Sequence, residues 1–125
     1  MTPVLFLALS VAGGVGAALR LVVDGTVKAH TRTSFPIGTM IINITGALLL
    51  GFVTEIAFRG ILPDAARLIV GTGLLGGYTT FSTASFESVR LIQQRRYGAA
   101  VLNSVGMVTL AVLAALAGAG LGGLL

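Results

Sequence analysis

The chain alternates between four long apolar stretches and short polar ones. The apolar stretches cover about residues 4–23, 35–58, 68–92 and 98–122, and each is long enough to cross a bilayer, which takes about 20 residues. Because the polar connections are short, we expect neighbouring helices to run antiparallel, with both chain ends on one side of the membrane. The pattern therefore predicts an all-α membrane protein, with four transmembrane helices in a single domain over residues 1–125.

The third apolar stretch departs from this pattern in its middle. The segment GTGLLGGYTTFSTASFE, residues 71–87, places two glycines before a run of hydroxyl side chains at Thr79, Thr80, Ser82, Thr83 and Ser85. Irregular backbone at membrane depth survives only where protein or water surrounds it. We expect the third helix to be broken at mid-membrane, so that its two halves present free carbonyls and N–H groups, an arrangement that transport proteins use to hold ions.

A few polar residues stand inside the other apolar stretches or at their ends. Arg20 closes the first stretch, where it either extends to the headgroups or lines a vestibule that attracts anions. Thr39 and Asn43 lie in the second stretch and either join helices or contact an ion. Glu87 follows the predicted break and is three residues from Arg90, so an ion pair between these two is the simplest interpretation.

Composition excludes several classes of protein. Hydrophobic residues make up 55% of the chain and charged residues only 10%, whereas a soluble domain carries about 25% charged residues. The net charge is +4, but the basic residues lie beside the spans, where membrane topology and anionic headgroups account for them without nucleic acid. The chain has no cysteine and one histidine, so it offers no catalytic constellation and we expect no enzyme.

Three segments together resemble one family of membrane proteins. They are GAALR at residues 16–20, FPIGTMIINITG at 35–46 and GGYTTFSTASFE at 76–87. In residue types and spacing they are similar to the Fluc fluoride channels, also called CrcB, and the similarity extends over nearly the whole chain. The third segment is the most specific of the three.

This resemblance implies a channel in the plasma membrane (the inner membrane of a bacterium) that passively exports fluoride and so protects the cell from fluoride toxicity. It implies an antiparallel dimer of dual topology with two pores and a structural Na⁺ ion at the dimer centre. By motif position, the backbone carbonyls of Gly76 and Thr79 would hold this sodium. The fluoride pore would be lined by Phe81, Asn43, Ser82 and Thr83, with Arg20, Thr39, Thr80 and Glu87 in the vestibule or in support.

Two features depart from the family pattern. Many members have a second pore phenylalanine where this chain has Ala84, which puts the paired aromatic lining in doubt. Basic residues also favour one side: the first and third connections collect Arg20, Lys28, Arg32, Arg90, Arg95 and Arg96, against Arg59 and Arg67 in the second. Such a bias favours a single orientation, so the dimer partner is either a second copy of the chain or a homologous second subunit.

The alternative function is a small four-helix coupled exporter of the multidrug type. Proton coupling needs a titratable carboxylate within a membrane helix. The first stretch has no acidic residue, and Glu55 and Glu87 lie toward the ends of theirs. A membrane scaffold without transport is supported only by the small residues of the helices, and it leaves the hydroxyl-rich break without a purpose.

Overall fold

The computed structural model describes all residues from 1 to 125, and every regular element in it is helical. The first two helices are α1 (Pro3–His30) and α2 (Ile37–Phe58). The third apolar stretch contains α3 (Asp64–Arg67), the π-helical η1 (Leu68–Leu75), α4 (Gly76–Tyr78) and α5 (Phe81–Gln93). The last stretch contains α6 (Tyr97–Val101), η2 (Leu102–Gly106) and α7 (Met107–Gly122).

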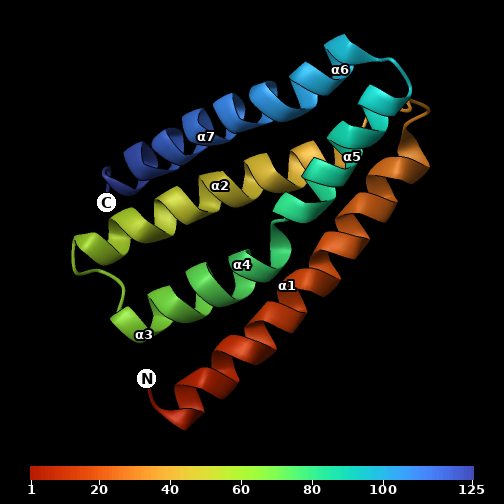
Figure 1. The fold of residues 1–125 in the computed structure, drawn as a ribbon. Helices are drawn as coiled ribbons and strands as arrows, with labels where there is room; N and C mark the ends of the chain where they lie inside the picture. The colour runs from red at the N-terminus through yellow and green to blue at the C-terminus, as the bar shows by residue number, and fades with distance from the viewer.

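Three helices are long and apolar enough to cross a membrane, and the chain is a multi-pass membrane protein. They are α1, α2 and the continuous helix formed by α6, η2 and α7. The fourth predicted span corresponds to the segment from α3 to α5, which two non-helical residues divide. Figure 1 shows α2 and α7 side by side, α1 on the opposite flank, and α3 and α4 between α1 and α2.

The first connection is shorter than the sequence predicts. The apolar stretches leave residues 24–34 as the first polar connection, but α1 continues through most of it to His30 and ends where Thr31 becomes extended. An ion pair between Asp24 and Lys28, four residues apart and 2.9 Å between charged atoms, supports the additional turns. The prediction took the end of the apolar stretch at Val23 as the end of the helix. It was wrong here because polar residues can continue a helix beyond its apolar part.

Small residues set how closely α1 approaches the third stretch. A Cβ atom on Gly16 would overlap the carbonyl of Leu74, and one on Gly77 would overlap the carbonyl of Gly13. The two helices therefore pack backbone to backbone, as small residues allow in membrane proteins. The small-residue pattern in the first stretch thus has a packing role, and it fixes η1 and α4 against α1.

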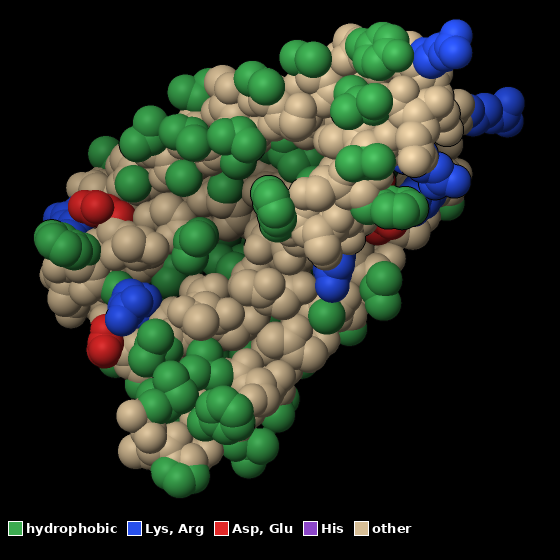
Figure 2. Space-filling model, viewed as in Figure 1, with side chains coloured by type: hydrophobic (Ala, Val, Ile, Leu, Met, Phe, Trp, Pro, Cys, Tyr) green, Lys and Arg blue, Asp and Glu red, His purple; other side chains and the backbone are tan.

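The surface is that of a protein surrounded by lipid or by a partner. Only 17 of 125 residues are buried, far fewer than a soluble core of this size requires. Most charged side chains on the visible face gather toward the two ends of the elongated molecule, and between them the surface shows hydrophobic side chains and uncharged groups (Figure 2). This distribution fits a bilayer across the middle of the molecule.

Candidate functional site

The predicted interruption of the third helix is present and lies at Thr79 and Thr80. Helix α4 ends at Tyr78, both threonines are extended, with ψ of 158° and 121°, and α5 begins at Phe81. Two glycines of poor helix propensity and two β-branched residues make this the weakest helical segment of the stretch. The first half closes with the Thr79 N–H and hydroxyl, which both donate to the Leu75 carbonyl at 2.9 Å.

Thr80 caps the second half of the broken helix. Its hydroxyl oxygen accepts the N–H of Thr83 at 3.2 Å and lies 3.0 Å from the Thr83 hydroxyl, to which it donates. The hydroxyl of Ser82 lies 3.4 Å from the same oxygen. Three hydroxyl groups thus gather at the N-terminus of α5, where the helix dipole is positive.

Asn43 of α2 holds the extended backbone of the break. Its amide nitrogen donates to the Thr80 carbonyl, and its amide oxygen accepts the Thr80 N–H, both at 2.9 Å. The same nitrogen also donates to the sulfur of Met107 at 3.2 Å. One side chain therefore replaces both hydrogen bonds that Thr80 would have made in a helix, and it joins three of the four apolar stretches.

A pocket of about 640 Å³ opens beside the break, between α2, the third stretch and the last one. Five of the predicted site residues line it: Asn43, Gly76, Thr79, Thr80 and Phe81. Phe81 is 87% exposed, so its ring is available to a ligand, to lipid or to another chain. The last stretch and α5 add four polar residues to the lining, Ser85, Ser88, Asn103 and Ser104, and the remainder consists of apolar residues and glycines such as Leu50, Leu75 and Val108.

Met107 is a lining residue that sequence reasoning missed and that contacts a predicted site residue, Asn43. It is 5% exposed and is one of three contacts of the Asn43 amide. A methionine in an apolar run gives no signal of such a contact, because the same residue is the usual filler of a hydrophobic core.

Asn103 is the most deeply buried polar side chain of the pocket lining. Its amide nitrogen donates to the Ala84 carbonyl at 3.2 Å and to the Ser88 hydroxyl at 2.9 Å. Its amide oxygen is buried without a partner. The side chain fixes the last stretch against α5 on the side of the pocket where Ala84 lies.

The remaining predicted residues are not among those that line this pocket. Ser82 and Thr83 are on the first turn of α5, and Thr39 is buried within α2. Glu87 lines a second pocket of about 380 Å³ together with Lys28, Arg90 and Gln94. Arg20 lines neither pocket, and its Nε atom is buried without a hydrogen-bond partner.

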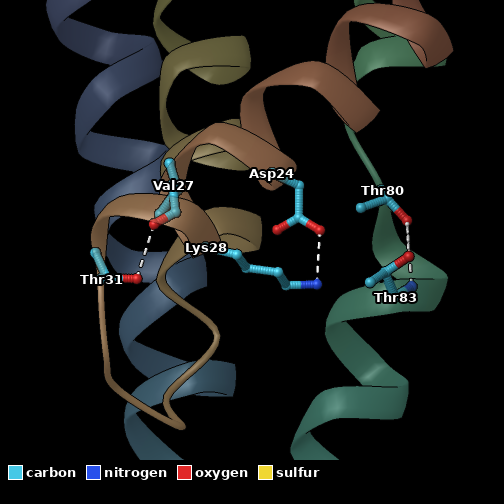
Figure 3. Close-up of polar contacts among 6 residues, drawn as sticks. All are labelled: Asp24, Val27, Lys28, Thr31, Thr80 and Thr83. Atoms are coloured by element: carbon cyan, nitrogen blue, oxygen red, sulfur yellow. Dashed lines mark hydrogen bonds and ion pairs between the residues drawn. The ribbon is translucent and has the colours of Figure 1, made fainter.

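The expected ion pair between Glu87 and Arg90 is not formed. The two ion pairs of the structure join Lys28 to Asp24 and Arg67 to Asp64, while one oxygen of Glu87 is buried without a partner. Figure 3 shows Asp24 and Lys28 on the last turns of α1, across from Thr80 and Thr83 at the start of α5. The second pocket thus carries charges of both signs, positive from Lys28 and Arg90 and negative from Glu87.

The carbonyls proposed for sodium are compatible with that ion. The Thr80 N–H, which would bond the Gly76 carbonyl in a continuous helix, is donated to Asn43 instead. The Gly76 carbonyl is therefore released from its helical partner, and Thr79, in extended backbone, precedes the new helix. Carbonyl oxygen is the hard ligand type that such cations take, so the donor set fits.

Comparison with known proteins places the chain in one family. Residues 7–119 match the family described as CrcB-like protein, Camphor Resistance (CrcB). A protein of Leifsonia xyli named fluoride-specific ion channel FluC 1 is 56% identical over 99% of this chain and 90% of its own length. A protein of Mycobacterium bovis named fluoride-specific ion channel FluC 2 is 42% identical over 94% of this chain and 90% of its own length. A protein of Sulfurovum named fluoride-specific ion channel FluC is 38% identical over 94% of this chain and 93% of its own length. The chain belongs to the CrcB family.

Proposed function

We propose that this protein is a fluoride-selective channel that exports fluoride passively across the cytoplasmic membrane. The observation that carries the proposal is the broken helix, clamped by Asn43 and flanked by an exposed Phe81 in an open pocket. Relatives that are 38–56% identical over nearly their whole length are named fluoride-specific ion channels. Resistance of the cell to fluoride would follow from the export.

The proposed anion path uses hydrogen-bond donors and an aromatic edge. Fluoride gives up its hydration only if other donors replace it, and the amide of Asn43 and the hydroxyls of Ser82 and Thr83 are such donors. The edge of an aromatic ring is electropositive, so Phe81 offers an apolar residue that still favours an anion. The positive N-terminus of α5 adds to this attraction.

The proposed assembly is an antiparallel dimer in which the segment from α3 to α5 forms a fourth span. In a single chain the pocket at the break is open on its side, and most of its exposed lining is apolar, which suits contact with another apolar helix surface. A second chain, either another copy or a homologous subunit, would cover it. The exposed ring of Phe81 would then lie between the two chains.

A sodium ion at the dimer centre belongs to the same proposal. The carbonyls of Gly76 and Thr79 from each chain would hold it. When bound, the ion would supply positive charge beside the anion path and keep the break open.

A proton-coupled exporter is the less favoured function. Coupling would need a carboxylate that faces the translocation path. Neither Glu55 nor Glu87 lines the pocket at the break. No acidic residue does so, and passive conduction therefore fits this pocket better.

Fluoride efflux from liposomes that contain the purified chain tests the proposal, with chloride as the control anion and no proton gradient imposed. We expect rapid fluoride efflux and little chloride efflux. Efflux only after addition of a homologous chain would assign a heterodimer. Absence of fluoride efflux with either preparation, or efflux that requires a proton gradient, would contradict the channel.

A further inference from the structure

The amide nitrogen of Asn43 has no unused donor hydrogen. An amide side chain offers one acceptor oxygen and two donor hydrogens. The oxygen accepts the Thr80 N–H, one hydrogen goes to the Thr80 carbonyl, and the other goes to the sulfur of Met107 at 3.2 Å. An anion that binds this amide must therefore displace one of the present partners.

The three contacts differ in how easily they are displaced. The two bonds to Thr80 satisfy a backbone N–H and a backbone carbonyl that are partly buried, and leaving such groups unpaired is costly. A thioether sulfur is a weak acceptor and loses little when its donor leaves. A hydrogen bond to an anion is also about twice as strong as one to a neutral group. The hydrogen that points to Met107 is therefore the one that an anion takes.

The position of Met107 suits such an exchange. It begins α7, is almost wholly buried, and lines the pocket at the break together with Asn43, Thr80 and Phe81. Its sulfur thus lies at the edge of the space in which the anion is proposed to move. The long unbranched side chain has the rotational freedom to withdraw.

We propose that Met107 is a positioning residue of the anion path: its sulfur holds one amide hydrogen of Asn43 in the pocket, and an entering fluoride ion displaces it. This inference rests on the proposed function. Conduction requires an ion to be bound firmly enough to enter and weakly enough to leave. The sulfur, by competing for the same hydrogen, shortens the stay of each ion.

Removal of the sulfur should raise the affinity for fluoride and lower the maximal efflux rate. Met107→Leu keeps the apolar volume but leaves the Asn43 hydrogen without a partner. Fluoride then displaces nothing, so the half-saturating fluoride concentration should fall about three- to fivefold, and the maximal efflux rate should fall with it because release is slower. A residue that acts only by packing would lower the maximal rate and leave the half-saturating concentration unchanged.

Nuclear magnetic resonance tests the contact without any transport. The chain has only two asparagines, Asn43 and Asn103, so protein labelled with ¹⁵N-asparagine in nanodiscs gives two side-chain amide pairs, which an Asn103→Ser variant assigns. We expect sodium fluoride to shift one Asn43 hydrogen and leave the other in place. Met107→Leu should shift that same hydrogen in fluoride-free protein, while the Asn103 pair stays unchanged. Unchanged Asn43 signals in the fluoride-free variant would overturn the proposal.

Norleucine keeps the experiment decisive where the leucine variant does not fold. It retains the shape of methionine and lacks only the sulfur. The wild-type chain grown on norleucine should show the same shift and the same fall in half-saturating concentration. Met40→Leu is the matched control, because Met40 makes no side-chain hydrogen bond and lines neither pocket. A norleucine protein with wild-type amide signals and wild-type half-saturation would also overturn the proposal.

The outcomes separate this inference from the channel itself. Wild-type protein without fluoride-selective efflux contradicts the proposed function, whatever the amide signals show. Selective wild-type efflux with an unaltered half-saturating concentration in the sulfur-free protein contradicts only the role of Met107.

Discussion

Asn43 and Thr80 hold each other through two hydrogen bonds of 2.9 Å, although 37 residues separate them in the chain. Asn43 thereby satisfies the backbone of the one residue that the break leaves extended and buried. The two interpretations of this asparagine, a link between helices and an ion contact, are therefore compatible. Two of its groups make the link, and the third points to a displaceable sulfur.

Asn43→Asp should impair both stability and transport. The carboxylate would place an oxygen against the Thr80 carbonyl, where the amide now donates, and we expect a loss of about 1–3 kcal/mol of unfolding free energy. A negative charge in the anion path should lower fluoride efflux more than about tenfold. Thermal unfolding in detergent and liposome efflux measure the two effects. A stable variant that conducts normally would show that Asn43 neither stabilises the break nor contacts the anion.

Phe81→Thr should lower fluoride efflux severalfold and leave stability nearly unchanged. The ring is 87% exposed, so its loss should alter the unfolding free energy by less than about 0.5 kcal/mol. Phe86→Thr is the matched control, because Phe86 is also exposed on α5 but does not line the pocket. Equal efflux from the two variants would mean that Phe81 contacts lipid and not the anion.

Gly77→Ala should destabilise the packing of α4 on α1. The new methyl group would overlap the Gly13 carbonyl, and forced backbone shifts of this kind cost about 1–3 kcal/mol. Gly14→Ala is the control, because nothing lies within 4 Å of a Cβ at that position. Melting temperatures in the same detergent compare the two. If both variants melt alike, then α1 and α4 are not held backbone to backbone.

Thr80→Val should weaken the start of α5. Valine keeps the branched shape but loses the oxygen that accepts the Thr83 N–H, and loss of such a cap costs about 1 kcal/mol. Thr80→Ser should retain most of the stability, because it keeps the hydroxyl. A valine variant as stable as the serine variant would show that the hydroxyl has no capping role.

Local features of the chain could be predicted from sequence, and long-range contacts could not. The break was predicted because glycine and hydroxyl residues interrupt an apolar run, and the structure places it at Thr79 and Thr80. The predicted end of α1 was wrong, because the helix continues past its apolar part, where an ion pair between Asp24 and Lys28 supports it. Roles assigned to Ser82, Thr83, Arg20 and the sodium carbonyls remain predictions.

The partners of Asn43 illustrate why the rest was out of reach. Its apolar surroundings showed that the amide needed a partner, but which backbone it would meet depends on how α2 packs against a helix far along the chain. For Met107 there was no signal at all, because a sulfur that accepts a hydrogen bond and one that fills a core have the same sequence context. Glu87 and Arg90 had the spacing of an ion pair and line the same pocket, yet the two ion pairs of the structure join other residues.

The length of α1 has a consequence for the shape of the protein at the membrane surface. Its 28 residues extend about 42 Å, while the hydrocarbon core is about 30 Å thick. Charged residues occupy the last two turns, so this end is the one that lies outside the hydrocarbon core. Val27 and Lys28 of this end line the second pocket, so an ion that enters that pocket meets fixed charges of the protein outside the hydrocarbon core.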